Sequence, residues 1–332
     1  MLLILILWVA LIIHGISTVN RDNRIFNIEQ TLALRGIAAI EIMIGHIGLS
    51  TGSIWLYPNR KAGILFVGIF FMLSGYGVAF GEDHKDSYLK KFLQNRILKL
   101  FVPAYLAYVL FVLIQFINAE NINLYDVINV AKFGKNLNWY VWEQLFFYLI
   151  YWLGSKLIPI YKEYFVTLCS ILLIILAFTF KLDNPWYGSS LCFVLGMYYY
   201  KFEKRKFKFD VVAKWLRFGI FSIILGISMA AFFLLGNESI IGNPIARNVA
   251  SASFCIMVIL VLKEMKIGNR VSEFLGTCSY EIFLIHPFIL VHLEKLIQIN
   301  ELLYGILVIF VTIIISYVLH KVSEKILKKL IL

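Results

Sequence analysis

Apolar runs long enough to cross a lipid bilayer dominate this sequence. A bilayer core about 30 Å thick needs roughly 20 apolar residues per helix, and only helices or closed barrels can cross it. We therefore expect an all-α fold, a polytopic transmembrane helical bundle of about 10–11 spans with no soluble domain. The candidate spans are 2–17, 36–57, 62–81, 100–117, 139–160, 163–180, 186–200, 215–235, 245–262, 279–297 and 302–320.

The composition agrees with a membrane protein. Hydrophobic residues make up 61% of the 332 positions and charged residues only 15%, a balance that a soluble domain does not tolerate. The net charge of +11 lies in short loops between spans, so it indicates membrane orientation and excludes a nucleic-acid binding face. The cysteines show no CxxC spacing and predict neither a disulfide framework nor a metal site: Cys169, Cys192, Cys255 and Cys278.

The Lys and Arg residues also predict the orientation. If the loop 18–35 is cytoplasmic, all but seven of the 31 Lys and Arg residues fall on the cytoplasmic side. The N-terminus is then outside and the C-terminus is cytoplasmic, as expected for a multi-pass protein of a bacterial inner (plasma) membrane. The seven basic residues on the outer side are Arg60, Lys61, Lys132, Lys135, Lys181, Arg247 and Lys295.

Three parts follow from the spans. Residues 1–24 form an extra N-terminal span and basic loop, 25–320 form the main membrane domain, and 321–332 form an amphipathic tail on the cytoplasmic surface. The first run could instead be a signal peptide. It lacks a basic n-region and a small-x-small cleavage site, so retention as a span is favoured.

The stretch LRGIAAIEIMIGH (34–46) carries the sharpest functional signal. Arg35 and His46 are eleven residues apart, which makes three helical turns plus about 20°, so they share one helix face. With Arg35 at a membrane surface, His46 lies about 16 Å deeper, where a titratable ring is a functional-site hypothesis. The alternatives are a boundary arginine and a buried structural histidine. Gly45 and Gly48 would let a backbone or a ligand approach, and Glu41, about 140° away, is expected to meet a cation on another helix.

Further polar residues remain inside or at the ends of other spans. Arg96 and Lys99 lie one turn apart at the inner end of a span, where they either bind ligand phosphates or snorkel to the surface. Glu143 lies beside an aromatic belt that includes Trp139, and it is either an interfacial acid or a group that orients a hydroxyl.

The late segment CSYEIFLIHPFIL (278–290) adds His286, directly before Pro287, and Tyr280 near the inner end of the same span. A catalytic role for His286 and a role as a hydrogen bonder at the proline kink remain equal alternatives.

Five segments together resemble the acyltransferase-3 family of integral membrane O-acyltransferases, which modify sugars and other envelope molecules of bacteria. They occur in the family's order: LRGIAAIEIMIGH, FVGIFFMLSGYGVAF (66–80), FLQNRILKLFVPAYL (92–106), WYVWEQLFFYL (139–149) and SYEIFLIHPFI (279–289).

The resemblance implies a cytoplasmic acyl-CoA donor, usually acetyl-CoA, and a glycan or lipid-linked sugar as acceptor. It places the family's catalytic and donor-binding basic residues on Arg35, Arg96 and Lys99, although many members have arginine where this chain has Lys99. It also places the family's histidine on His46, which acts as a general base or carries the acyl group itself.

On the acceptor side, the family's span acid falls on Glu143, which we expect to bind and orient the acceptor. The tryptophan that often precedes the late histidine is replaced by Ile285. We expect the acceptor to contact Glu143, His286, Trp139 and Tyr280, and the reaction to need no metal.

A transporter or flippase is the competing class, because intramembrane Arg, Glu and His residues also mark substrate pathways. The sequence shows no inverted repeat of interrupted helices. It leaves the acceptor and the oligomeric state open, since the small-xxx-small pair Gly77 and Gly81 fits packing inside the bundle as well as dimerisation.

Overall fold

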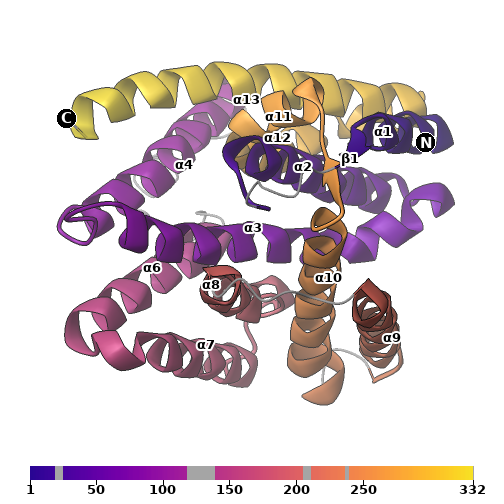
Figure 1. The fold of residues 1–332 in the computed structure, drawn as a ribbon. Helices are drawn as coiled ribbons and strands as arrows, with labels where there is room; N and C mark the ends of the chain where they lie inside the picture. Colours follow the sequence, from indigo (N-terminus) through magenta and orange to yellow (C-terminus); the bar gives the residue numbers. More distant parts are fainter. Residues whose placement is uncertain (19–24, 118–138, 205–210, 236–238, 332) are drawn as a thin grey trace.

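The computed structural model describes residues 1–18, 25–117, 139–204, 211–235 and 239–331, and these are almost entirely helical (Figure 1). The predicted all-α bundle is confirmed. The predicted outer loop around 118–138 and part of the basic loop 201–214 lie outside the described residues. The α-helices are α1 (Leu2–His14), α2 (Ile28–Thr51), α3 (Tyr57–His84), α4 (Phe92–Ile117), α6 (Trp139–Leu157), α7 (Lys162–Thr179), α8 (Leu191–Lys204), α9 (Val211–Leu235), α10 (Ala246–Leu262), α11 (Arg270–Thr277), α12 (Ser279–His292) and α13 (Glu301–Ile331).

Short elements connect these helices. A π-helical turn, η4 (Ile241–Ile245), leads into α10. The 3-10 turns are η1 (Ile54–Leu56), η2 (Pro159–Tyr161), η3 (Asn184–Trp186) and η5 (Glu294–Leu296). Two strands, β1 (Ile16–Thr18) and β2 (Met265–Ile267), pair antiparallel with Ile16 opposite Ile267, so they join the segment after α1 to the loop between α10 and α11.

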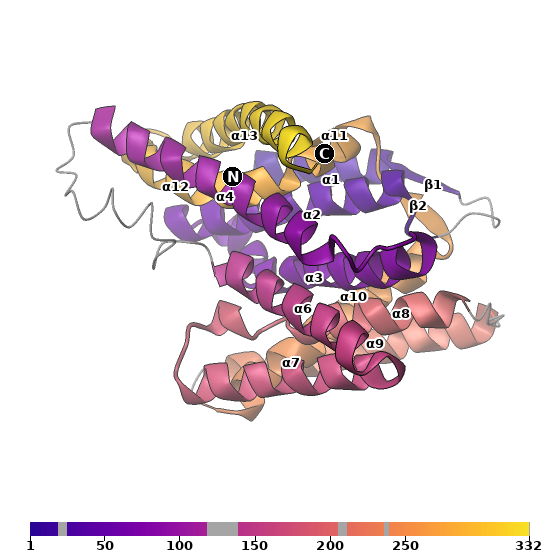
Figure 2. The ribbon, with the colours of Figure 1, turned by 90° about the vertical axis from the view of Figure 1, so that its left-hand side faces the viewer.

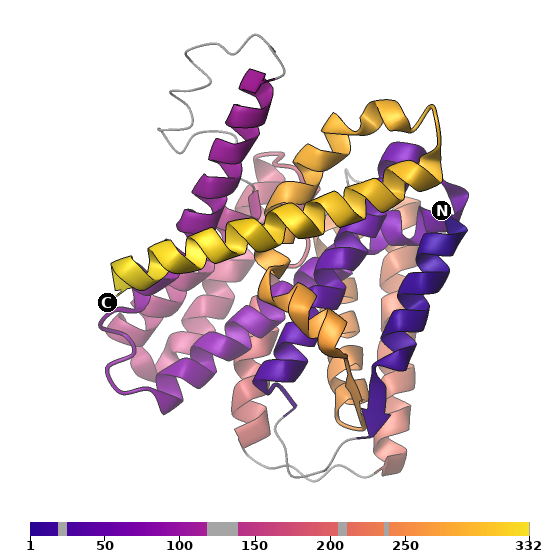
Figure 3. The ribbon, with the colours of Figure 1, turned by 90° about the horizontal axis from the view of Figure 1, so that it is seen from above.

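Helix α2 lies in the middle of the molecule. In Figure 1, α13 runs along the top, α3 runs below α2, and α7 lies at the bottom. Seen from above, α13 crosses over the bundle (Figure 3), and the turned view shows α6 and α7 on the side away from α13 (Figure 2). Helix α2 contacts α3, α11, α12 and α13. A residue on α2 can therefore meet side chains from several other helices.

Local sequence explains both ends of α2. The Asn27 side chain accepts a hydrogen bond from the Gln30 amide at the N-terminus, and Gly52 ends the helix in the left-handed conformation with φ 68°. Gln30 also donates to the Ile267 carbonyl over 2.6 Å. The start of α2 is thereby fixed to β2, and this end of the bundle carries Arg35.

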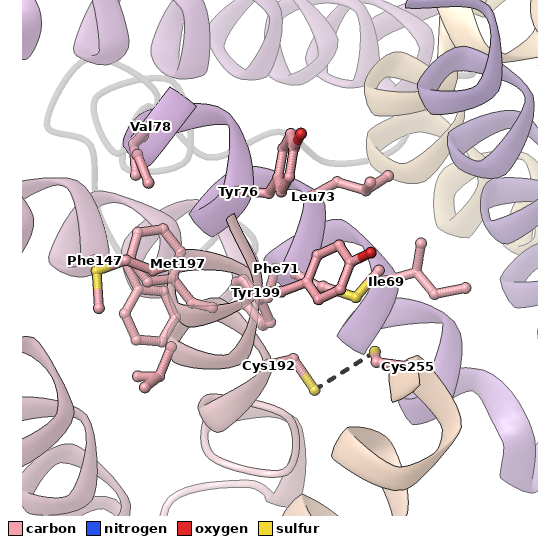
Figure 4. Close-up of a cluster of buried hydrophobic side chains, with 14 of the residues drawn as sticks. Ile69, Phe71, Leu73, Tyr76, Val78, Phe147, Cys192, Met197, Tyr199 and Cys255 are labelled. Atoms are coloured by element: carbon pink, nitrogen blue, oxygen red, sulfur yellow. Dashed lines mark hydrogen bonds between the residues drawn. The ribbon is translucent and has the colours of Figure 1, made fainter. Parts of the chain in front are cut away.

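The largest core cluster surrounds the crossing of α3 and α8, where aromatic and sulfur-containing side chains meet (Figure 4). Gly75 and Gly196 let the two backbones touch: a Cβ at Gly75 would overlap the Phe193 carbonyl oxygen, and one at Gly196 would overlap the Met72 carbonyl oxygen. Membrane helices pack closely through small residues in this way.

Replacing either glycine at this crossing is expected to destabilise the protein. Gly75→Ala forces backbone against backbone, at a cost of about 1–3 kcal/mol, and should lower the melting temperature of the detergent-solubilised protein. Gly77→Ala is the matched control, because a Cβ there meets no atom within 4 Å. Equal melting temperatures for the two variants would contradict this packing.

Among the described residues, fewer helices qualify as membrane spans than the 10–11 that the sequence predicts. Within the described residues, seven helices are long and apolar enough to cross a membrane, and the pair α11 and α12, bent by 76°, makes an eighth if it counts as one span. Helices α1 and α8, with 13 and 14 residues, are only about 20 Å long, and α6 is rich in Trp and Tyr. Short or aromatic-rich apolar helices thus resemble full spans in the sequence.

The C-terminal segment 321–332 is predicted as a separate amphipathic tail. In the structure α13 continues without a break from Glu301 to Ile331. The described tail residues are therefore the last turns of that helix, and pairs such as Lys328 and Glu324, 2.9 Å apart, follow one of its faces.

Candidate active site

Three cationic side chains predicted from separate segments meet in one cavity. Arg35 of α2 and Arg96 and Lys99 of α4 line a space of about 210 Å³, together with Tyr280 of α12. We call these three basic residues the collar. Helix periodicity placed Arg96 and Lys99 on one face, and the contact between α4 and α12 brings that face to Arg35.

Two collar arginines differ in how they are held. Arg96 donates to the Tyr88 hydroxyl over 2.6 Å and lies over the Tyr148 ring at 5.1 Å. Burial raises the pKa of the Tyr88 phenol, so it stays neutral and does not cancel the charge of Arg96. Arg35 forms no hydrogen bond or ion pair within the part of the chain that the structure describes. Its guanidinium is available to a ligand.

A basic pocket of about 440 Å³ continues from the collar toward the loop between α3 and α4. It shares Arg96 and Lys99 with the collar cavity and adds Lys85, Lys90 and Lys91. Five cations at one entrance suit a polyanionic ligand.

His46 opens into a different and larger cavity. In the run 36–48 all residues except His46 are buried, and His46 is exposed to a space of about 610 Å³. We call this space the histidine cavity. Its wall includes Trp139, Phe283 and His286, and the rings of His46 and His286 lie 5.1 Å apart between centroids. Two of the predicted acceptor-contacting residues, Trp139 and His286, thus join His46, while Tyr280 lies at the collar.

The hydrogen bonds of His286 fix which ring nitrogen carries the proton. Its Nδ1 lies 3.0 Å from the Ile282 carbonyl oxygen, which can only accept, so Nδ1 is the donor. In the neutral ring Nε2 is then a bare acceptor, and it is buried without a partner among the described residues. His286 is therefore both a hydrogen bonder near the proline of α12 and an unsatisfied acceptor in the cavity wall.

Close packing beside His46 brings a second helix to the cavity. A Cβ at Gly45 would lie 2.6 Å from the Asn59 carbonyl oxygen. The glycines around His46 therefore admit the backbone at the start of α3, rather than a ligand. This contact places Arg60 on the cavity wall.

The cavity has a cationic rim that the sequence reasoning did not assign to the site. Arg60, Lys61 and Arg247 line it. Their position on the predicted outer side, within a turn or so of a span end, was the available signal. Arg247 lies far from Arg60 and Lys61 in the sequence, however, and only the fold brings the two segments together.

The collar and His46 were expected to line one common cavity, and the structure shows two. Phe70, Tyr140 and Phe283 lie between them, with Tyr140 and Phe283 rings 5.1 Å apart and Phe70 6.3–6.4 Å from each. Phe70 and Tyr140 line the collar cavity, whereas Phe283 lines the histidine cavity. We call these three rings the aromatic partition.

Glu143 lies outside both cavities. It is 1% exposed, and its Oε1 accepts a 2.6 Å hydrogen bond from Ser190 while Oε2 has no partner among the described residues. Its predicted contact with the acceptor stays a prediction.

Glu41 was expected to meet a cation, and this expectation is wrong. Its carboxylate accepts hydrogen bonds from Trp8 Nε1 at 2.9 Å and from Asn59 Nδ2 at 2.6 Å. Two neutral donors, one from α1 and one from the start of α3, therefore satisfy it. The described residues also contain no group of three or more His, Cys, Asp or Glu side chains that could hold a metal ion.

Comparison with known protein families gives a match over most of the chain. A family model described as an acyltransferase domain, that of the acyltransferase-3 group, matches residues 32–321 and so includes the collar, the partition and the histidine cavity. No curated protein and no solved structure matches the chain.

Proposed function

Because this chain belongs to the acyltransferase-3 family, we propose that it moves an acetyl group from cytoplasmic acetyl-CoA to a hydroxyl of a cell-envelope glycan. Family membership supports a membrane acyltransferase. The donor, the acceptor and the residue roles are our proposal, and they rest on the two cavities.

The donor is proposed to bind at the collar. CoA carries several phosphates, and the loop pocket and collar together offer Lys85, Lys90, Lys91, Arg96 and Lys99 at one continuous entrance. Arg35 lines the collar cavity but not the loop pocket, and it forms no hydrogen bond or ion pair among the described residues, so it suits the phosphate nearest the pantetheine arm.

The thioester must then pass the aromatic partition to reach His46. Along α2, Arg35 and His46 are about 16 Å apart, and residues of α12 wall both cavities. In this proposal the partition closes the route when no donor is bound, and the acyl arm displaces its rings. Such closure keeps water and ions from crossing between the two cavities.

The chemistry is proposed to take place at the paired imidazoles. His46 takes the proton of the acceptor hydroxyl, the oxygen attacks the thioester carbonyl, and the CoA sulfur leaves as a thiolate that is then protonated. His286, with its proton fixed on Nδ1, holds Nε2 as an acceptor for a proton on the His46 ring. The single observation that carries the proposal is this exposed imidazole in a cavity adjoining a cationic collar.

The experiment uses the purified full chain in lipid nanodiscs with acetyl-CoA labelled in the acetyl group. Addition of an envelope glycan extract is expected to move label into glycan, and mass spectrometry of glycans from cells with and without the gene should show the lost acetyl increment. Uptake of a substrate into vesicles without any acyl donor would instead favour a transporter.

A substitution of Glu143 distinguishes a structural role of this residue from a catalytic one. Glu143→Gln keeps a hydrogen-bonding side chain toward Ser190 and removes a carboxylate that reaches neither cavity. We expect acetyl transfer to fall by less than about tenfold, below the range of a lost acid or base. A loss of about a hundredfold or more in transfer rate, with unchanged melting temperature, would mean that Glu143 takes part directly in the reaction.

A further inference from the structure

Three basic residues give the histidine cavity a positive charge. Arg60, Lys61 and Arg247 all line it, and no acidic residue appears among the described residues that form its wall. The remaining wall is mostly apolar, so these three cations set the charge of the opening.

These cations lie at the end of the bundle away from the collar. Arg60 and Lys61 are in the first turns of α3, directly after α2 ends at Thr51. Arg247 is at the start of α10, whose other end, 17 residues and about 25 Å away, leads to β2 beside the beginning of α2. The two cationic groups therefore lie at opposite ends of the route through His46.

Aromatic rings position the arginine side chains of this cavity, but their Nε–H groups have no acceptor among the described residues. Arg247 lies over the Phe232 ring at 4.1 Å, and Lys61 lies 5.8 Å from the same ring centroid. Among the described residues, the buried Nε atoms of Arg60 and Arg247 have no hydrogen-bond partner, and neither arginine forms an ion pair. A buried N–H left without an acceptor is costly, and membrane arginines without a function are rare.

We propose that these three residues bind an acidic group of the acceptor, so the acceptor is an acidic glycan that carries phosphate or carboxylate near the hydroxyl to be acylated. This inference rests on the proposed function and names its substrate class. The position of Arg247 over the Phe232 ring fixes the plane of its guanidinium, and its Nε–H, which has no partner among the described residues, can bind one oxygen of a carboxylate or phosphate while a neighbouring Nη–H binds the other. With the anion at the rim, the neighbouring hydroxyl reaches into the cavity toward His46.

The test compares binding of matched probes to the full chain in nanodiscs of neutral phosphatidylcholine. The probes are a uronic-acid trisaccharide and its methyl ester, which keeps the hydroxyls and removes the charges, and a short glycerol-phosphate oligomer. An acidic probe should bind at least about tenfold more tightly than the ester, as expected for charge-assisted hydrogen bonds, and its binding should weaken with added salt.

Arg60→Gln and Arg247→Gln should each weaken binding of the acidic probe by about tenfold. Lys295→Gln is the matched control, since Lys295 is exposed, lies on the same predicted side and is not part of the cavity wall. Retained binding of acetyl-CoA shows that the variants are folded.

Equal binding of the acid and its ester, or no binding of either acidic probe, overturns the proposal. It is also overturned if the variants bind the acidic probe normally and lose only co-purified anionic phospholipid, because the cations then serve lipid headgroups. Acidic-probe binding without any use of acetyl-CoA would support the anion site and count against the acyltransferase reaction, so the two failures are distinguishable.

Discussion

Acetyl transfer is expected to fall by about 10²- to 10⁴-fold in His46→Ala. The imidazole is the one exposed group in the otherwise buried run 36–48, and it faces His286 across the histidine cavity. Its loss removes the group that takes the acceptor proton. The measurement is the rate of label transfer from acetyl-CoA to glycan at saturating donor, with donor binding measured separately.

The matched control for this prediction is His292→Ala. His292 lies on α12, and its Nδ1 is 2.8 Å from the Phe288 carbonyl oxygen, a contact like that of His286 with Ile282. It is not among the residues that line the histidine cavity. It should retain transfer. Retention of more than about a tenth of the wild-type rate by His46→Ala would contradict a general acid–base role. Acetyl label on the wild-type chain that hydroxylamine releases at neutral pH, and that is absent from this variant, would indicate an acyl-histidine intermediate.

The second large effect is expected at the collar. Arg35→Gln should raise the KM for acetyl-CoA by about 10- to 100-fold with a smaller change in kcat, because a lost charge-assisted contact of about 1.5–3 kcal/mol weakens donor binding. Among the collar residues, Arg35 is the best one to replace, because it forms no hydrogen bond within the described residues. Arg96, by contrast, donates a hydrogen bond to the Tyr88 hydroxyl.

A donor without phosphates makes the Arg35 test sharper. The variant and the wild type should use S-acetyl-pantetheine with similar KM values, because the contact that Arg35 loses is to a phosphate. Lys156→Gln is the control for general charge, since Lys156 is exposed at the end of α6 and away from the collar. An equal penalty for both donors would mean that Arg35 supports the fold rather than the phosphates.

Local periodicity predicted much of this site. The eleven-residue spacing places Arg35 and His46 on the same face, and both line cavities walled by α12. The one-turn spacing of Arg96 and Lys99 likewise holds within α4. These relations depend only on helix geometry, which the sequence carries directly.

Relations between distant segments were beyond such reasoning. The rim residues Arg60 and Arg247 belong to different helices, and the neutral partners of Glu41 come from α1 and from the start of α3. The aromatic partition was also missed, because Phe70 and Phe283 look like ordinary core residues in apolar spans. Tertiary packing decides these contacts, and apolar periodicity alone does not.

The most direct test of the account is a structure of the full chain with acetyl-CoA bound. We expect the CoA phosphates at Arg35, Arg96 and Lys99 and the Phe283 and Tyr140 rings displaced. The thioester carbon should lie near His46, with room for an acceptor oxygen about 3–3.5 Å from that carbon. A donor bound away from the collar, or an acyl group that stops below a closed partition, would contradict this account.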